Sequence, residues 1–130
     1  MIKEPEDLEL ENAVIERAEI RSGDHGVLTV WLYLTYGGRN QGFGGHCLYA
    51  PKSFKYHTLE SLAGHFIFRT MEIAGITDWS DLPGKTIRVR HNHSIVWEIG
   101  HIINEDWFCP AKDFESVTKE NEKEEEADAS

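Results

Sequence analysis

The pattern of hydrophobic and polar positions predicts β-strands in five stretches of the chain, and the two kinds of residue alternate in the first and fourth of them. The stretches are Asn12–Arg21, Val27–Tyr36, Phe43–Tyr49, Lys85–Arg90 and Ile95–Ile103. Clusters of turn residues separate them, and the cluster from Ser22 to Gly26 predicts a hairpin between the first two. We therefore expect an antiparallel sheet of about five strands.

The first two stretches differ in their pattern. Val14, Ala18 and Ile20 share one parity in the first stretch, which predicts a strand with one buried face. Val27–Tyr36 is apolar on both parities, which predicts a central strand that is covered on each side.

A helical period occurs in one long stretch, from Ser61 or Leu62 to Ala74, and Gly75 can end it in a left-handed conformation. A short turn over Thr77–Leu82 and a final edge over Trp107–Pro110 complete the pattern. The fold class is α+β: an antiparallel sheet of about five strands with one main helix packed on a face.

Charge and composition divide the chain into three parts. Residues 1–11 are a polar, flexible lead-in, residues 12–117 a single α+β domain, and residues 118–130 a disordered acidic C-terminal tail. The net charge is −10, and without the tail 11 basic and 17 acidic residues remain, or −6. This balance opposes sequence-independent binding to a phosphate backbone, so duplex DNA is not an expected partner. A small anionic ligand and the basic groove of another protein remain possible partners.

The sequence holds no apolar run of the roughly 20 residues that a membrane span needs. Its two cysteines, Cys47 and Cys109, lack a Cys-x-x-Cys spacing and are expected to be reduced. We expect a soluble protein of the bacterial cytoplasm without membrane contact, and exposed sheet edges that could pair two chains as a homo-oligomer.

Five glycines fall within nine residues after the second stretch, more than a turn needs. They are Gly37, Gly38, Gly42, Gly44 and Gly45. One interpretation is a nest of backbone N–H groups that holds a phosphate or carboxylate, with Arg39, Asn40 and Gln41 at its rim. The other is a wide hairpin whose glycines permit tight turning and a bulge. The spacing is neither a Walker loop nor a dinucleotide fingerprint.

The segment KTIRVRHNH is the most basic part of the chain. Arg88 and Arg90 share one parity and could contact a phosphate bidentately, with His91 beside them. They could equally pair with Glu16, Glu19 or Glu98 on neighbouring strands.

Metal and catalytic chemistry have weaker signals. His91 and His93 could hold zinc together with His101 or Cys109, but no ligand lies at a recognisable third position. The spacing of the Ser, His, Asp and Cys residues supports no catalytic set. We therefore expect a protein without catalytic residues, bound metal or cofactor.

The four tryptophans are Trp31, Trp79, Trp97 and Trp107. Most are expected in the core, but one or two could form a stacking platform for a nucleobase.

Small proteins encoded by bacteriophages and prophages resemble this chain in four segments: AEIRSGDHGVLTVWLYLTYGG, QGFGGHCLY, RTMEIAGITDWSDLPGKTIRV and IGHIINEDWF. The similarity runs from Ala13 to Phe114, and the YGG…QGFGG loop is among its most specific parts. It supplies no catalytic residues. It implies a phage origin, and accessory phage proteins without catalytic motifs often counter host defence or serve DNA replication and recombination.

The leading hypothesis is a non-enzymatic phage protein that inhibits a bacterial anti-phage defence, through either a nucleotide-type ligand or a host defence protein. Its most concrete form is sequestration of a nucleotide second messenger, with phosphate on the glycine amides and a base on Phe43 or a tryptophan. The expected ligand-binding residues are Gly37, Gly38, Arg39, Gln41, Gly42, Phe43, Gly44, Gly45, Arg88, Arg90 and His91. One alternative is an acidic inhibitor of a CRISPR or other nucleic-acid-binding effector. The other is a DNA-metabolism protein similar to single-strand-binding proteins.

Overall fold

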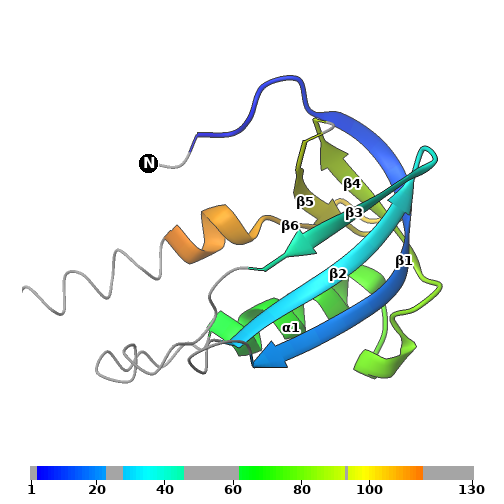
Figure 1. The fold of residues 1–130 in the computed structure, drawn as a ribbon, viewed down its shortest axis with the longest axis vertical. Coiled ribbons are helices and arrows are strands. Elements are labelled where there is room, and N and C mark those ends of the chain that lie inside the picture. Colours follow the sequence, from blue (N-terminus) through cyan, green and yellow to red (C-terminus); the bar gives the residue numbers. More distant parts are fainter. Residues whose placement is uncertain (1–2, 23–27, 46–61, 93, 116–130) are drawn as a thin grey trace, which may run out of the picture.

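The computed structural model describes residues 3–22, 28–45, 62–92 and 94–115 (Figure 1). The acidic tail, the connection from residue 46 to residue 61 and His93 lie outside the described residues. The sequence predictions that fall on those segments therefore stay predictions.

The described chain has the expected α+β class, with one main helix and an antiparallel sheet of six strands rather than five. The strands are β1 Glu9–Ser22, β2 Leu28–Tyr36, β3 Arg39–Gly44, β4 Thr86–His91, β5 Val96–Gly100 and β6 Trp107–Phe108. The main helix α1 spans Leu62–Ala74, as predicted, and Gly75 ends it with a φ of 70°. A short 3-10 helix (η3) covers Trp79–Asp81, and residues 110–115 are helical.

The strand order in the sheet is β3-β2-β1-β4-β5-β6. The long β1 serves two partners: Glu9 to Val14 pair with β4, and Val14 to Ser22 pair with β2. Strands β1, β2 and β3 follow one another as neighbours, and β4 returns through the connection that carries α1 to lie beside β1. This arrangement is a Greek key.

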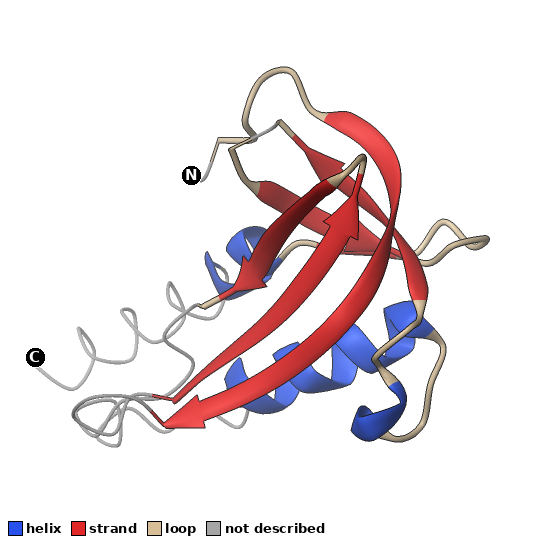
Figure 2. Ribbon diagram, turned by 45° about the vertical axis from the view of Figure 1, so that its right-hand side comes forward, coloured by secondary structure: helices blue, strands red, loops and turns tan. Residues whose placement is uncertain are grey.

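The sheet is strongly twisted, and its end strand β3 lies near β5 (Figure 2). The Gln41 side chain joins the two, since its Nε2 donates a hydrogen bond to the Ser94 carbonyl oxygen at 2.6 Å. The sheet is therefore curled into a partly open barrel.

The core lies between the inner face of the sheet and α1, which contributes Phe66 and Ile73. Phe66 lies 5.9 Å from Phe43 and 5.3 Å from Phe108, measured between ring centroids. This aromatic cluster joins the helix to β3 and β6, strands at opposite ends of the sheet. Burying such rings favours the curled sheet, because one helix can then cover both ends of it.

The predicted parity of β1 was wrong for Val14. A bulge between Ile15 and Arg17 changes the register, so Ala13 and Ile15 point inward before it and Ala18 after it. Val14 is on the outer face and 39% exposed. An extra residue in one strand reverses the faces of those that follow, which simple alternation does not predict.

Three strand boundaries also differ from the prediction. β1 begins at Glu9, inside the expected lead-in, because Glu9 to Glu11 pair with β4. β3 begins at Arg39 rather than Phe43, because the turn before it takes only two residues. β5 ends at Gly100 rather than Ile103, where the His101 ring accepts hydrogen bonds from two backbone N–H groups and turns the chain.

Candidate functional site

The expected glycine loop is a tight hairpin. Gly37 and Gly38 form a two-residue turn with φ values of 54° and 74°, the arrangement that a type I′ hairpin requires. Gly42 and Gly44 lie within β3 and pair with Tyr33 and Trp31. The Gly45 N–H donates to the Val30 carbonyl oxygen at 2.8 Å. The nest of free amides was therefore a wrong expectation, and the hairpin interpretation holds.

The glycines of β3 make room for Trp31. A Cβ atom at Gly42 would lie 2.9 Å from the Trp31 ring, and one at Gly45 would lie 2.1 Å from it. The indole therefore lies across the outer surface of β3, where side chains would otherwise stand. Gly44 is constrained differently, because a Cβ there would lie 2.2 Å from the Val30 carbonyl oxygen.

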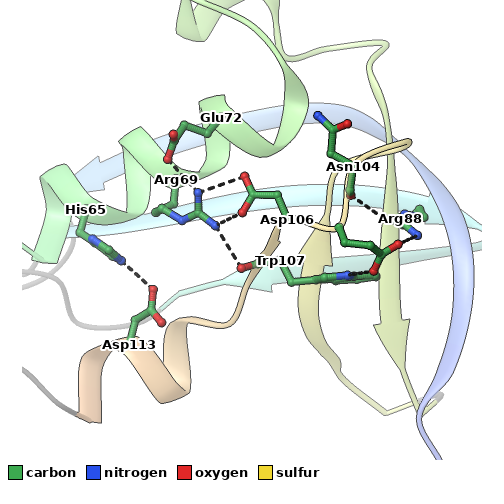
Figure 3. Close-up of polar contacts among 9 residues, drawn as sticks. His65, Arg69, Glu72, Arg88, Asn104, Asp106, Trp107 and Asp113 are labelled. Atoms are coloured by element: carbon green, nitrogen blue, oxygen red, sulfur yellow. Dashed lines mark hydrogen bonds and ion pairs between the residues drawn. The ribbon is translucent and has the colours of Figure 1, made fainter.

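Arg88 is held by the chain that follows β5 (Figure 3). Its Nε donates to the His101 carbonyl oxygen at 2.6 Å and its Nη2 to the Asn104 carbonyl oxygen at 2.7 Å. Its Nη1 donates to Glu105 at 3.1 Å, and the guanidinium lies 4.9 Å above the Trp107 ring. Arg88 therefore fixes the connection between β5 and β6.

Arg90 is paired as the second interpretation of this segment anticipated. It contacts the largely buried Glu98 on β5 and also Glu4, at 2.9 Å. β1 lies between β4 and the hairpin of β2 and β3, so the strand that carries the two arginines does not pair with the glycine hairpin. The phosphate site expected from these parts is not assembled.

A second polar cluster joins α1 to β6 (Figure 3). Arg69 donates to Asp106 at 2.7 Å, to Glu72 at 2.7 Å and to the Trp107 carbonyl oxygen at 3.0 Å. The hydrogen bond from Arg69 holds the pKa of the Asp106 carboxyl below its ordinary range. These contacts fasten the helix to the sheet.

The outer surface of β1 and β2 carries stacked aromatic rings. The Trp31 and Tyr33 rings lie 6.5 Å apart with an interplanar angle of 24°. Arg17 lies 4.1 Å above the Tyr33 ring, and Glu19 accepts a hydrogen bond from the Tyr33 hydroxyl at 3.1 Å. We call Arg17, Glu19, Trp31 and Tyr33 the aromatic face.

The aromatic face shows why β2 is apolar on both parities. Val30, Leu32 and Leu34 point into the core, whereas Trp31 and Tyr33 are only half-buried on the outer surface. The expectation that β2 is covered on each side was therefore wrong. Among the described residues, the outer aromatic side chains form a half-buried surface rather than a second core.

A groove of about 280 Å³ adjoins the aromatic face, between β3 and β5. Trp31, Gln41, Gly42 and Gly44 form one wall, Ser94 to Trp97 the other, and residues 110 and 111 line it further. The Trp97 Nε1 atom is buried and has no hydrogen-bond partner among the described residues. A buried donor without an acceptor costs about 1–3 kcal/mol. An acceptor that reached it would therefore be bound favourably.

The side chains of Gln41 and Asn92 fix the walls of the groove through hydrogen bonds. Gln41 crosses from β3 to the Ser94 carbonyl oxygen and also accepts a hydrogen bond from the Tyr36 hydroxyl. On the opposite wall, Asn92 Oδ1 accepts the backbone N–H groups of Ser94 and Ile95, each at 3.1 Å. The walls are thus held by hydrogen bonds before any ligand arrives.

Several residues of the predicted site lie elsewhere. Phe43 is 3% exposed in the aromatic core, and His91 is 1% exposed, so neither is an open surface for a base. Of the predicted set, Gln41, Gly42, Phe43 and Gly44 line the groove. The sequence reasoning missed Arg17, Tyr33 and Ile95 as parts of this region. The only available signal was the alternation of aromatic residues with the core residues of β2.

The comparisons with known proteins give no relative: no family model, no curated protein and no solved structure matches the chain. In the part of the chain that the structure describes, no helix is both long and apolar enough to span a membrane.

Proposed function

We propose that the chain is a non-enzymatic binding module that takes unpaired nucleobases of a single-stranded nucleic acid on the aromatic face and in the adjoining groove. The observation that carries this proposal is the stacked pair of half-buried rings Trp31 and Tyr33, of which Trp31 lies over the backbone of Gly42 and Gly45. Every base has a flat π-face, so stacking on such rings suits a ligand of variable sequence.

The topology supports the proposal by analogy. The strand order β3-β2-β1-β4-β5, with a helix between β3 and β4 and a curled sheet, is that of the partly open Greek-key barrel called the OB-fold. In that fold, the outer surface of strands 2 and 3 and the loop between strands 4 and 5 bind oligonucleotides or oligosaccharides. Here Trp31 of the aromatic face lies across the outer surface of β3, and the groove lies between β3 and the segment that enters β5. Fold alone does not determine function, so the aromatic side chains carry more weight.

Charge sets the expected mode of binding. Arg17 and Arg21 are more than 60% exposed and both contact Glu19, at 3.2 and 3.3 Å. Exposed ion pairs of this kind contribute only about 0–1 kcal/mol, so a phosphate can replace Glu19 at little cost. With a net charge of −10, the chain is unsuited to many simultaneous phosphate contacts. We therefore expect stacking to dominate and the salt dependence to be shallow.

Cys109 supports a binding role rather than a covalent one. Its side chain is buried, and burial raises the pKa of its thiol. A thiol of this kind is a poor nucleophile, because the thiolate is the reactive form.

A free nucleotide is the second candidate, as in the hypothesis of second-messenger sequestration. The groove of about 280 Å³ is slightly smaller than the range of about 300–1,000 Å³ for small-ligand pockets, so it would take no more than a single nucleotide. The acidic inhibitor of a nucleic-acid-binding effector has only the net charge to support it. The resemblance to phage-encoded proteins suggests either phage DNA metabolism or inhibition of host defence as the setting.

The test is a fluorescence-anisotropy titration of full-length protein against labelled oligothymidylate of about twelve nucleotides, a typical length for such sites. A duplex of equal length and a panel of cyclic and linear dinucleotides are the other arms. We expect the single strand to bind with a Kd of about 1–100 μM, and the duplex to bind more weakly. Trp31→Leu should weaken binding at least about fivefold, since stacking on one ring contributes about 1–3 kcal/mol.

Phe68→Ala is the control, because Phe68 is 63% exposed on α1 and belongs to neither the aromatic face nor the groove. Binding by the dinucleotides but not the oligomer would replace the first candidate with the second. The proposed function is refuted if none of these ligands binds. It is also refuted if Trp31→Leu and Phe68→Ala weaken binding equally.

A further inference from the structure

Two carboxylates and a buried imidazole meet where β1 begins. Glu9 lies directly opposite His91 in the ladder between β1 and β4, and Glu11 lies two residues further along β1. Glu11 Oε2 is 3.0 Å from His91 Nε2, and one donor atom from each of the three residues lies within 4.8 Å of the others. This cluster is separate from the aromatic face.

The two glutamates occupy the inward parity of β1. Ala13 and Ile15 continue the same row and are fully buried in the core. Two partly exposed carboxylates on that row lie beside a ring that is only 1% exposed, and their like charges repel each other. An imidazolium can offset one of the two negative charges, whereas a divalent cation offsets both.

The neighbours of the cluster come from the hairpin between β2 and β3. The Tyr36 ring lies 4.4 Å from the His91 ring, and a Cβ atom at Gly37 would lie 3.5 Å from Glu11. Arg39 pairs with Tyr36 in the ladder, and both Arg39 and Glu11 act electrostatically on the Tyr36 hydroxyl. Burial raises the pKa of the Tyr36 phenol, so this hydroxyl adds no negative charge at neutral pH.

We infer that Glu9, Glu11 and His91 bind one divalent transition-metal ion, of which Zn²⁺ is the best match. Zinc takes imidazole nitrogen at about 2.0–2.1 Å and carboxylate oxygen at about 2.0–2.2 Å, which places two tetrahedral ligands about 3.3 Å apart. The distance between Glu11 and His91 is close to that value, and a carboxylate oxygen of Glu9 lies within 4.8 Å of both ligand atoms. An imidazole ligand favours zinc over magnesium.

The site differs from the one that the His91-x-His93 spacing suggests. His93 lies outside the described residues, and His101 already accepts two backbone hydrogen bonds through Nδ1. Two of the three ligands, Glu9 and Glu11, come from β1, about 80 residues earlier in the chain. Three protein ligands leave a fourth position for water or another donor.

The test uses full-length protein that has been treated with a chelator and desalted. Zn²⁺ is titrated by calorimetry and by thermal unfolding, Mg²⁺ is the comparison ion, and Co²⁺ reports coordination through its visible absorption. We expect one equivalent of Zn²⁺, a rise in Tm, and the absorption of a tetrahedral Co²⁺ complex. Glu9→Gln and Glu11→Gln should each weaken Zn²⁺ binding at least about tenfold, because each removes a charged ligand.

Glu16→Gln is the matched control, since Glu16 is an exposed glutamate of the same strand and lies outside the cluster. Glu11→Gln retains an amide oxygen that can accept a hydrogen bond from His91, and the Tm of each variant without metal checks that it is folded. If neither Zn²⁺ nor Co²⁺ binds, the ion pair and Arg39 satisfy the cluster and the inference is wrong. Equal weakening by Glu11→Gln and Glu16→Gln would place any bound zinc at other residues and also refute it.

Discussion

Two regions of the molecule combine a tryptophan, a glycine strand and an arginine, with different results. Trp107 covers Gly100, where a Cβ would lie 2.6 Å from the ring, and Trp31 covers Gly42 and Gly45 in the same way. Around Trp107, Arg88 and Glu105 satisfy both the indole N–H and the backbone of the β5–β6 connection. We call Trp107, Gly100, Arg88 and Glu105 the Trp107 clamp.

The charged side chains of the aromatic face do not enclose its tryptophan in the way that Arg88 and Glu105 enclose Trp107. Its arginine lies on Tyr33 and is 63% exposed, and its carboxylate serves two arginines at the surface. An aromatic ring flat on glycine is thus a structural element in one place and an open surface in the other. The polar contacts around the ring, rather than the ring and its glycines, distinguish the two.

The largest expected effect is that of Trp107→Ala on stability. Removing this ring leaves a cavity above Gly100 and takes a partner from Arg88, so the free energy of unfolding should fall by about 3 kcal/mol. Chemical denaturation measures it. The folded fraction of this variant should bind oligothymidylate as the unmodified protein does. If binding is lost while stability is unchanged, Trp107 belongs to the binding surface, and the assignment of a structural role to the Trp107 clamp is wrong.

Gly45→Ala tests the floor of the aromatic face. A Cβ there would lie 2.1 Å from the Trp31 ring on a residue with a φ of 72°. Backbone strain and overpacking together should lower the free energy of unfolding by about 2 kcal/mol, and displacement of Trp31 should weaken oligonucleotide binding.

Gly38→Ala is the control for that substitution. Gly38 has a φ of 74° but open space where a Cβ would stand. It should show the backbone strain alone, about 1 kcal/mol, with unchanged binding. If both variants bind equally well, the position of Trp31 does not matter for the ligand.

Arg88→Met and Arg17→Met compare the two arginines. Arg88→Met leaves two carbonyl groups of the β5–β6 connection without their donor and should lower the free energy of unfolding by about 1–3 kcal/mol. Arg17→Met breaks an exposed ion pair and should change it by less than about 0.5 kcal/mol. Thermal and chemical unfolding measure both. If the two variants lower the free energy of unfolding equally, the distinction between the Trp107 clamp and the aromatic face is contradicted.

The smallest effect concerns pH and the contact between Arg69 and Asp106. The hydrogen bond from Arg69 lowers the pKa of Asp106 below its ordinary value of 3.8, so the pair is fully stabilising above that pH. As pH falls through the lower folded-state pKa, protonation removes the contribution. Asp106→Asn should therefore lower the free energy of unfolding by at most about 1 kcal/mol at pH 7, and by progressively less below pH 3.8.

Asp81→Asn, at an exposed aspartate of the 3-10 helix, is the control for that titration. A difference between Asp106→Asn and the unmodified protein that stays constant down to pH 2 would show that charge plays no part in the contact.

Sequence patterns were sufficient to predict the fold class and the bounds of α1, because alternation and helical period arise directly from burial. They were insufficient at Val14, where a bulge reversed the parity, and at Arg39, which looked like part of a loop. Local patterns do not specify a bulge, or a two-residue turn inside a glycine-rich stretch, because both depend on the partner strand.

The predicted site illustrates a different limit. Arg88 and Arg17 are both arginines on strands, and their sequence neighbours do not reveal that one faces three carbonyl or carboxylate partners and the other faces solvent. Phe43 was expected to be an exposed ring but lies in the core. Tyr33 is on β2, which was expected to be covered on each side, but its ring is only half-buried on the outer surface. Only the three-dimensional pairing of distant segments determines which polar groups are already satisfied.

The most direct test is ¹⁹F NMR of protein labelled with 5-fluorotryptophan, which gives one resonance for each of the four tryptophans. Single Trp→Phe variants assign them, and oligothymidylate is then added. The account predicts that the resonances of Trp31 and Trp97 shift with saturation, while those of Trp79 and Trp107 stay in place. A shift confined to Trp79 or Trp107, or no shift at all, would contradict it.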